Sequence, residues 1–275
     1  MREIAVIILN YNTWKDTIKE VESVIYTCDV KPQDIYVIDN ASTNDSVFQL
    51  ELYSKNRFNL ITSNKNNGYA AGNNIGLRLA YKKGYKYAWI LNNDIIIQDK
   101  NIIKKNITIL KNHNDVACVS PDIYTPNGYI FNRDSIRPNF WDFTFGMLAY
   151  KKKGRKIFLK ENFGYVYRPQ GCCMFLNLEY LNKVDYFDEH TFLYCEEIIL
   201  AERLLNLGYK CACNVNSSVI HNHSKTVKNT FQKKEIIKIK ESSFDYYLSK
   251  YRNYNIISRK IVVLFDIIKW NILKN

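Results

Sequence analysis

The sequence predicts an α/β protein, in which a mostly parallel sheet is flanked by helices and followed by a C-terminal helical extension. In residues 1–120, short runs rich in β-branched and aromatic residues alternate with segments whose apolar residues recur at helical spacing. This alternation is typical of a parallel sheet covered by helices. Residues 232–275 instead predict two or three further helices. With 275 residues and 47% hydrophobic content, the chain is long enough to bury a large core.

The expected elements of the first half follow one another in alternating order. The expected strands are residues 4–9, 35–38, 60–62, 87–91 and 117–119. The expected helices between them are residues 15–26, 45–55, 70–82 and 100–111.

The second half is less regular. Residues 124–165 show no clear period and carry a basic run at 151–155, so we expect a ribbon or a mobile flap there. Regular structure resumes at 166–178, and a helix over 196–206 is followed by Gly208 in a common stop position.

Charge and cysteine content limit the kinds of binding partner that we expect. The net charge is +12, and the residues from Lys225 onward contribute twelve Lys or Arg against four Asp or Glu, a balance of +8. No nucleic-acid-binding motif accompanies this charge, so we expect no nucleic acid and favour an anionic membrane surface. Seven cysteines without zinc-knuckle spacing indicate reduced, buried thiols.

The termini and hydropathy suggest a location. The chain begins with a strand-like run and shows no signal peptide, so we expect a cytoplasmic protein. No apolar run approaches the roughly 18 residues that a spanning helix requires. In the tail, one helical face carries Ile261, Leu264, Phe265, Ile268 and Ile272. This face can lie on the inner leaflet of the membrane, pack on the rest of the protein or contact a second subunit.

Polar side chains follow four successive strands. Ligands of open parallel sheets bind at the carboxyl ends of the strands, so these positions are candidate binding residues. They are Asn10, Tyr11 and Asn12 after the first strand, Asp39 after the second, Asn66 and Gly68 after the third, and Asn92, Asn93 and Asp94 after the fourth. Each alone is also an ordinary turn or cap residue. Together they predict a site for a nucleoside diphosphate, in which Gly68 would let the backbone approach the ligand closely and Asp94 is a suitable ligand for Mg²⁺ or Mn²⁺.

The second half adds candidate catalytic and metal-binding residues. Glu196 and Glu197 begin a predicted helix, where acidic residues also favour the helix dipole. His221 and His223 follow a predicted strand and can supply a further metal ligand.

Five segments in order resemble the inverting family 2 glycosyltransferases of the GT-A fold, and within them the rhamnosyltransferase-like branch of bacterial polysaccharide assembly. They are residues 6–12, 37–42, 66–76, 91–94 and 187–197, within a match of roughly residues 4–225. The resemblance implies a GT-A catalytic domain over 1–225, with a nucleotide-sugar-binding half (1–120) and an acceptor and catalytic half (121–225). Residues 226–275 are then a basic amphipathic helical tail.

The resemblance also implies roles for single residues. Asp39 would hold the base of the donor, residues 66–74 with Asn73 and Asn74 would lie along it, and Asp94 with His221 would bind a divalent metal, Mn²⁺ or Mg²⁺. Glu197 would be the catalytic base that removes the proton of the acceptor hydroxyl. The expected donor is dTDP-rhamnose or a UDP-hexose, and the expected acceptor is a glycan or a lipid-linked sugar.

Two features leave alternatives open. The family usually has Glu-Asp where this chain has Glu196-Glu197, and often a further Asp where it has Ile199, so the base is Glu197 or Glu196. The competing functions are a nucleotidyltransferase and a catalytically inactive sugar- or nucleotide-binding module. The sequence also leaves the oligomeric state open.

Overall fold

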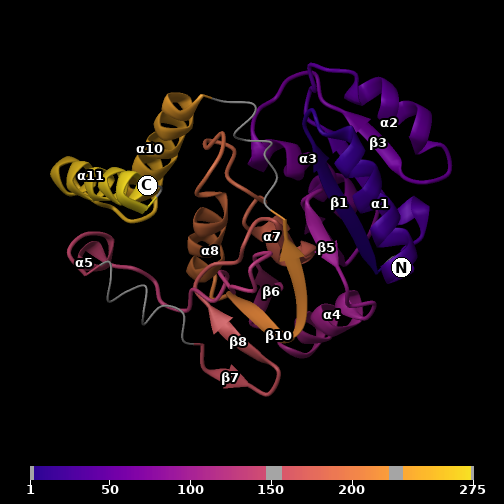
Figure 1. Ribbon diagram of the computed structural model, residues 1–275. Helices are drawn as coiled ribbons and strands as arrows, with labels where there is room; N and C mark the ends of the chain where they lie inside the picture. The colour runs from indigo at the N-terminus through magenta and orange to yellow at the C-terminus, as the bar shows by residue number, and fades with distance from the viewer. Residues whose placement is uncertain (1–2, 147–156, 223–231, 274–275) are drawn as a thin grey trace.

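The computed structural model describes residues 3–146, 157–222 and 232–273, and it confirms the α/β fold class. In these residues one sheet of ten strands runs through the molecule, with most of its path in the order β3-β2-β1-β4-β9-β6-β10-β8-β7 and β5 paired to β10 (Figure 1). The strands are β1 Ile4–Asn10, β2 Ile35–Asp39, β3 Asn59–Thr62, β4 Tyr87–Leu91, β5 Ile95–Ile97, β6 Val116–Tyr124, β7 Leu159–Lys160, β8 Phe163–Val166, β9 Cys173–Asn177 and β10 Lys210–His221.

The helices lie on both faces of this sheet and beside it. They are α1 Trp14–Cys28, α2 Ser46–Ser54, α3 Tyr69–Lys82, α4 Ile102–Asn112, α5 Phe140–Phe143, α7 Leu178–Lys183, α8 Glu196–Asn206, α10 Lys233–Lys250 and α11 Ile256–Leu273, with a short 3₁₀ turn at Pro32–Asp34. The predicted strands and helices of the first half are all present, with ends that differ mostly by one to three residues.

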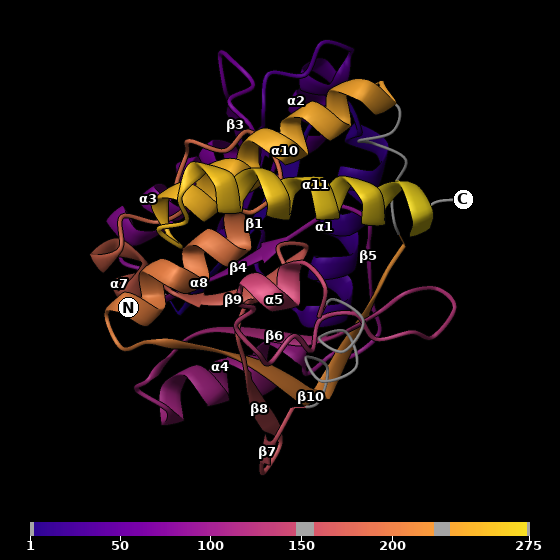
Figure 2. The ribbon, with the colours of Figure 1, turned by 90° about the vertical axis from the view of Figure 1, so that its left-hand side faces the viewer.

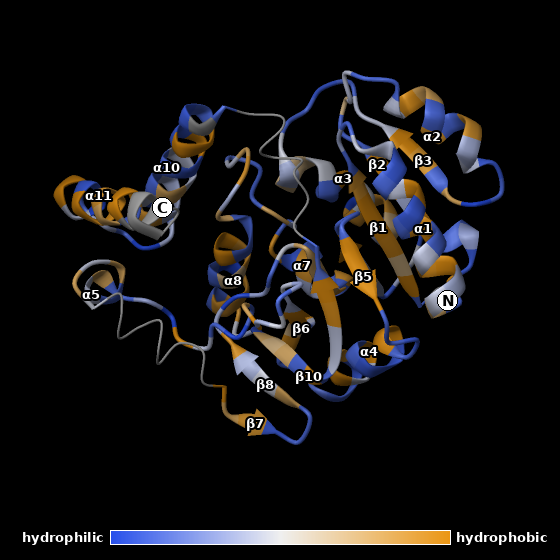
Figure 3. Ribbon diagram, in the orientation of Figure 1, coloured by the Kyte–Doolittle hydropathy of each residue, from blue (hydrophilic) through white to orange (hydrophobic). Residues whose placement is uncertain are grey.

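Alternation along β1 shows how the core is divided. Val6 and Ile8 pack into one buried cluster with residues of α1 and α4, and Ala5 and Ile7 pack into a second with α3 and α8. Because successive side chains of a strand point to opposite faces, a strand covered on both faces needs an unbroken apolar run. Figure 3 shows β1 and β5 as strongly hydrophobic ribbons among polar loops.

The parallel half of the sheet ends at β4. β1, β2, β3 and β4 pair in parallel, whereas β9 runs antiparallel to both of its neighbours, β4 and β6. The ribbon expected within residues 124–165 is present, because β7 and β8 pair antiparallel there, and the short helix α5 in the same stretch was not expected. The basic run 151–155 lies outside the described residues.

The tail forms two helices that pack on α8. Ile199 of α8 is fully buried together with Tyr247 and Leu248 of α10 and Val262 of α11. Figure 2 shows α10 and α11 crossing over the side of the molecule where α8 and α5 lie. In the described part of the chain, no helix combines the length and apolar character needed to cross a membrane.

Candidate active site

The loops after β1 and β2 are tied together by hydrogen bonds around Asp39. The Asp39 carboxylate is fully buried and accepts from Asn10 Nδ2 at 2.7 Å and from the backbone N–H of Ser42 at 2.8 Å. Asn12 has a left-handed backbone (φ 59°), and its side-chain oxygen accepts from Thr43 N at 2.8 Å. The predicted residues Asn10, Asn12 and Asp39 thus meet and fix the shape of this edge.

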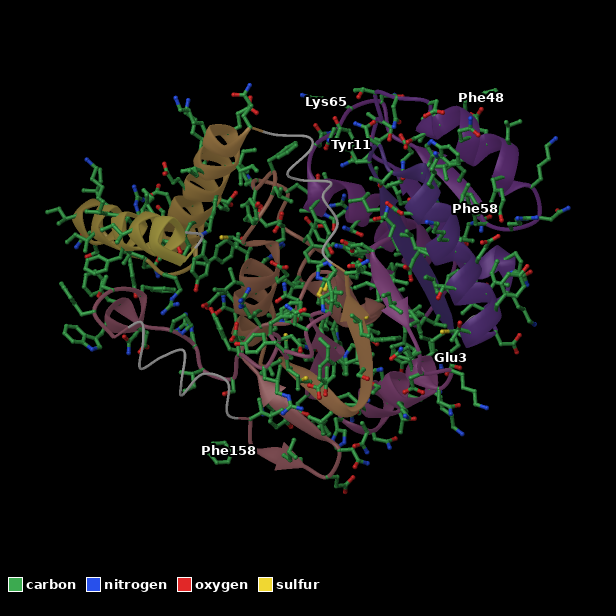
Figure 4. All side chains as sticks on the ribbon, in the orientation of Figure 1. Glu3, Tyr11, Phe48, Phe58, Lys65 and Phe158 are labelled. Carbon is green, nitrogen blue, oxygen red and sulfur yellow. The ribbon has the colours of Figure 1, made fainter. Side chains whose placement is uncertain are left out.

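Figure 4 shows which edge of the sheet this is. Glu3, before β1, lies at one end of the strand, and Tyr11, just after it, lies at the other, near Lys65 from the loop after β3. Tyr11 is partly exposed. The loops that follow β1 and β3 therefore share the carboxyl edge, as the parallel pairing of the strands requires.

The start of α3 is fixed by Gly68. Its φ of +93° suits glycine, and a Cβ at this position would lie 2.0 Å from the carbonyl oxygen of Phe192. The close approach that we expected toward a ligand is therefore to the protein's own backbone at Phe192. Asn66 supports the same turn, because its side-chain oxygen accepts from Gly68 N at 3.0 Å and from Asn40 Nδ2 at 2.9 Å.

Asn73 and Asn74 are both buried within α3. Asn74 donates to the carbonyl of Phe187 at 2.9 Å and to Glu189 at 2.7 Å, and it accepts from Phe187 N at 3.0 Å. Asn73 donates to the carbonyl of Tyr69 at 3.0 Å. The structure thus places Asn74 as a clamp on residues 187–189, so that the second half of the chain is held against α3.

Asn92 and Asn93 follow β4 and face different groups. The backbone N–H of Asn92 donates to the carbonyl of Cys172 at 2.9 Å, and Asn92 lines the cavity described below. Asn93 donates to the hydroxyls of Thr13 and Thr17, both at 2.8 Å, so it links the β4 edge to the start of α1.

Asp94 and His221 are brought together by a strand that the sequence did not reveal. β5 begins directly after Asp94 and pairs antiparallel with the end of β10, with Ile95 opposite His221. The imidazole Nε2 of His221 consequently lies 3.1 Å from Oδ1 of Asp94, and both side chains are about nine-tenths buried. His221 is the last residue of β10, and His223 lies outside the described residues.

The spacing of these two groups fits a divalent metal. Ligand bonds of about 2.0–2.1 Å at a right angle place neighbouring ligand atoms about 3 Å apart. A carboxylate and an imidazole both suit Mn²⁺, and an oxygen-rich remainder of the shell suits Mg²⁺. Among the described residues no cluster of three or more His, Cys, Asp or Glu forms a fuller metal site.

Glu197 is held in place by the turn before α8. Tyr194 and Cys195 both have left-handed backbones, with φ of 73° and 70°, which is costly for residues with a side chain. The Glu197 carboxylate accepts from the backbone N–H of Gly171 at 3.0 Å, and a Cβ on Gly171 would lie 2.6 Å from that carboxylate. The hydroxyl of Tyr69 holds the other side of this segment by donating to the Gly171 carbonyl at 2.6 Å.

Glu196 occupies a different environment. It is 3% exposed, and among the described residues its Oε1 has no hydrogen-bond partner. Burial, and secondly the neighbouring charge of Glu197, raises the pKa of Glu196 to about 8. At neutral pH Glu196 is therefore mostly protonated, which makes the partly exposed Glu197 the better proton acceptor of the two.

A cavity of about 520 Å³ joins these groups. Its lining includes His221 and Asn92, the two glutamates Glu196 and Glu197, and residues of the tail helices. Other lining residues include Tyr69, Asp134, Asp142, Phe143, Arg168, Gly171, Lys240, Phe244 and Asp266. The other predicted binding and metal-ligating residues are not among the lining residues: Asn10, Tyr11, Asn12, Asp39, Asn66, Gly68, Asn73, Asn74, Asn93 and Asp94.

A match to a family model shows which protein family the chain belongs to. The model described as glycosyl transferase family 2 matches residues 5–179, which is more than half of the chain. The protein is a family 2 glycosyltransferase. The match spans the carboxyl-edge loops, Asp94 and the Gly171 segment that holds Glu197.

Two curated glycosyltransferases are similar in sequence. One is the low-salt glycan biosynthesis hexosyltransferase Agl10 of Haloferax volcanii, which is 27% identical over 264 residues, covering 94% of this chain and 76% of that protein. The other is the O-antigen chain rhamnosyltransferase WbaN of Salmonella anatum, 22% identical over 74% of this chain and 61% of its own length.

Solved structures of the GT-A fold match this glycosyltransferase over most of its length. A mannosyltransferase of Pyrobaculum calidifontis in complex with GDP-Man and Mn²⁺ aligns with a TM-score of 0.61 and 15% identity, over 97% of this chain and 69% of that one. TarS 1–349 of S. aureus in complex with UDP-GlcNAc aligns with a TM-score of 0.58 and 15% identity, over 95% of this chain and 70% of that one. The predicted GT-A fold is confirmed.

Several residues of the cavity were not predicted. Tyr69 belongs to a segment that carries the family resemblance, but its hydrogen bond to the Gly171 carbonyl, and the hydrogen bond of the Gly171 N–H to Glu197, depend on three-dimensional packing. Asp134 and Phe143 come from the stretch without a clear period, and Arg168 comes just after it. Only the crossing of the tail over α8 brings residues of α10 and α11 to the same cavity.

Proposed function

We propose that this enzyme transfers a sugar from a nucleoside diphosphate donor, dTDP-rhamnose or a UDP-hexose, to a hydroxyl of a glycan or lipid-linked acceptor, with inversion of the anomeric centre. The observation that carries the proposal is the shared cavity, which His221 of the Asp94 pair lines together with Glu197. One of the two proposed metal ligands, His221, and the proposed proton acceptor, Glu197, therefore face one space. The names of the two sequence relatives support a role in glycan synthesis.

The proposed steps use residues of the chain itself. The carboxyl-edge loops around Asn10, Asn12 and Asp39 would receive the nucleotide, and Asp94 with His221 would hold a divalent metal beside its diphosphate. Such a metal would stabilise, as a Lewis acid, the negative charge that develops on the departing diphosphate. We propose no further ligand from the cysteines, because burial raises the pKa of the Cys172 and Cys173 thiols.

Glu197 would then act on the acceptor. Its carboxylate takes the proton of the acceptor hydroxyl while the hydroxyl oxygen bonds to the anomeric carbon, and the bond from that carbon to the diphosphate oxygen breaks with its electron pair. The Gly171 N–H keeps the carboxylate oriented for this transfer. Protonated Glu196 would be a hydrogen-bond donor rather than the base.

We also infer a position on the inner face of an anionic membrane for the C-terminal tail. Ile257, Leu264 and Ile268 of α11 are exposed on the side opposite to buried Val262, and Trp141 of α5 is exposed nearby. The net charge of +8 over residues 225–275 would attract anionic lipid to the tail. The side chain of Ile272, the last residue of the predicted apolar face, lies outside the described residues.

A thermal-shift screen of nucleoside diphosphate sugars, with and without Mn²⁺, tests the donor assignment. A donor at 100 times its Kd should add about 2.7 kcal/mol to the free energy of unfolding. The proposal expects dTDP-rhamnose or a UDP-hexose to stabilise the enzyme in a metal-dependent way, and to be turned over. Binding without turnover on any glycan would favour an inactive binding module, and stabilisation by no sugar nucleotide would contradict the proposal.

A further inference from the structure

The cavity beside Glu197 has a wall built from the tail helices. Lys240 and Phe244 of α10 and Asp266 of α11 line it. The Nζ of Lys240 lies 2.6 Å from a carboxylate oxygen of Asp266, and each of these side chains is about one-quarter exposed. The family match ends at residue 179, so this wall lies outside the segment that the chain shares with the family model.

The tail helices are firmly docked at this place. Buried Glu202 of α8 accepts from Arg137 at 2.7 and 2.8 Å and from Tyr167, whose hydroxyl is 2.9 Å from that of Tyr247 on α10. A second anchor is Asp188, which accepts from the hydroxyls of two tyrosines of the α10 region. Because two buried carboxylates hold α10, its inner face is a fixed part of the cavity.

A third contact joins α10 to the turn that carries the glutamates. The hydroxyl of Ser243 donates to the carbonyl of Leu193 at 2.8 Å, one residue before the left-handed pair that precedes Glu196. Phe244, the next residue of α10, makes an edge contact with Phe143 at a centroid separation of 5.5 Å. The tail wall and the catalytic turn therefore belong to one packed unit (Figures 1 and 2).

The charges of the cavity indicate what can enter it. Five carboxyl side chains line it against two cationic ones, Arg168 and Lys240. Each cation already faces a carboxylate, because Arg168 lies 2.8 Å from Asp134 and Lys240 pairs with Asp266. In the described ranges, the remaining carboxyls have no ion-pair partner, and one of them, Glu196, is almost fully buried with an oxygen that has no hydrogen-bond partner there. They are Asp142, Glu196 and Glu197.

This balance disfavours an anion in the acceptor position. A phosphate or carboxylate on the acceptor would meet the negative charges of Asp142 and Glu197 in a partly desolvated space, whereas Glu196, mostly protonated at neutral pH, adds no charge. Sugar hydroxyls can both donate to carboxylates and accept from an ammonium group, and the apolar faces of a sugar ring suit aromatic walls such as Phe143 and Phe244. Paired Lys240 and Asp266 offer a donor and an acceptor side by side.

We propose that Lys240, Phe244 and Asp266 form the acceptor-binding wall of this enzyme, and that the sugar unit they select beside Glu197 is uncharged. This rests on the proposed function, since it takes the cavity to be the acceptor site. If the acceptor is carried on a lipid diphosphate, its phosphates lie outside the cavity and an uncharged unit presents the reacting hydroxyl. The tail is then part of the catalytic unit.

Saturation-transfer NMR titrations on the full chain with four small probes test the inference. The probes are methyl β-glucoside, the methyl glycoside of N-acetylglucosamine, methyl glucuronide and glucose 1-phosphate. The neutral glycosides should bind, and the two anionic probes should bind more weakly than either. Lys240→Met should weaken the neutral glycosides by about tenfold, as expected for one lost hydrogen bond to a charged group.

Lys238→Met is the matched control, because Lys238 lies on the same helix but is exposed and does not line the cavity. It should bind the glycosides as the unchanged protein does, and Asp266→Asn, which keeps the side-chain shape, should weaken them. Three results would each overturn the inference: the two lysine variants bind the glycosides equally, either anionic probe is preferred, or no probe binds. Thermal unfolding with a nucleotide sugar and Mn²⁺ separates the two proposals. If the donor binds but the neutral glycosides are not preferred, this inference alone is wrong. If the neutral glycosides are preferred but no nucleotide sugar binds, the donor assignment is wrong.

Discussion

The imidazole of His221 lies 3.1 Å from the carboxylate of Asp94, although the two residues come from opposite halves of the chain. The contact exists because β5, which starts at Ile95, pairs with the last residues of β10. The backbone adds a further link, since Asn222 N donates to the carbonyl of Asp94 at 3.0 Å. A ladder between two strand ends thus sets the spacing of the candidate metal ligands.

We therefore predict that Asp94→Asn and His221→Ala each weaken Mn²⁺ binding and lower sugar transfer by at least about 100-fold, because an amide or methyl group is a poor substitute for these ligands. Mn²⁺ binding is measured by electron paramagnetic resonance and transfer by initial rates. Asp185→Asn is the control, since its side chain is 80% exposed. Full activity of either ligand variant in EDTA would contradict the assignment.

Glu197→Gln should keep donor binding but lose transfer by about 10²- to 10⁴-fold, the usual contribution of a general base. The amide can still accept from Gly171 N–H, so the turn should survive. Calorimetric titration of the donor and initial rates separate the two effects. Glu196→Gln should cost less activity, and a larger loss in Glu196→Gln than in Glu197→Gln would exchange their roles.

The raised pKa of Glu196 predicts a pH dependence of stability. In the folded protein Glu196 keeps its proton up to about pH 8, whereas in the unfolded chain it ionises near its ordinary value of 4.5. Folding therefore binds a proton in this window, and the free energy of unfolding should fall as pH rises from about 4.5 to 8. Glu196→Gln should remove up to about 4 kcal/mol of that fall, as urea unfolding at several pH values would reveal. Parallel curves for the two proteins would show that Glu196 ionises normally.

Much of the fold could be predicted from the sequence because its signals are local. The alternation along β1 and the polar residues after each parallel strand depend only on neighbours in the chain, and both identify the carboxyl edge. β5 escaped prediction because three isoleucines are too short a run, and their partner in β10 is remote. The same limit applies to α5, a helix of four residues in which Phe140 and Phe143 pack against the tail.

The same difference between local signals and contacts of remote segments decides which residues of the candidate site could be predicted. Residue types with a known preference, such as Asp94 and Glu197, could be named, because their chemistry does not depend on a partner. We expected Gly68 to let the backbone approach a ligand closely, whereas in the structure it allows the close approach of the Phe192 carbonyl. Lys240 and Asp266 could not be connected with the site at all, since only the packing of α10 and α11 on α8 places them there.

The last prediction concerns the exposed face of α11. Vesicles containing phosphatidylglycerol should carry the full chain upward in flotation at moderate salt, and vesicles of phosphatidylcholine alone should carry much less. Each basic residue near an anionic leaflet contributes about 1 kcal/mol, and apolar side chains entering the interface add to this. The paired change Leu264→Asp with Ile268→Asp should abolish flotation, because it places two carboxylates on the proposed contact face without touching buried Val262.

The control for this experiment is Phe48→Asp with Leu52→Asp, which changes two similarly exposed apolar residues on α2, far from the tail in Figures 1 and 4. That variant changes the net charge by the same amount as the α11 variant but leaves the proposed contact face intact, so it should float as the unchanged protein does. Equal loss in both variants would mean that net charge alone governs binding. A different result would be that no form of the protein floats and that the α11 variant shifts from dimer to monomer in light scattering. The exposed face of α11 would then be a subunit contact, since a second copy can cover the same apolar side chains as readily as lipid can.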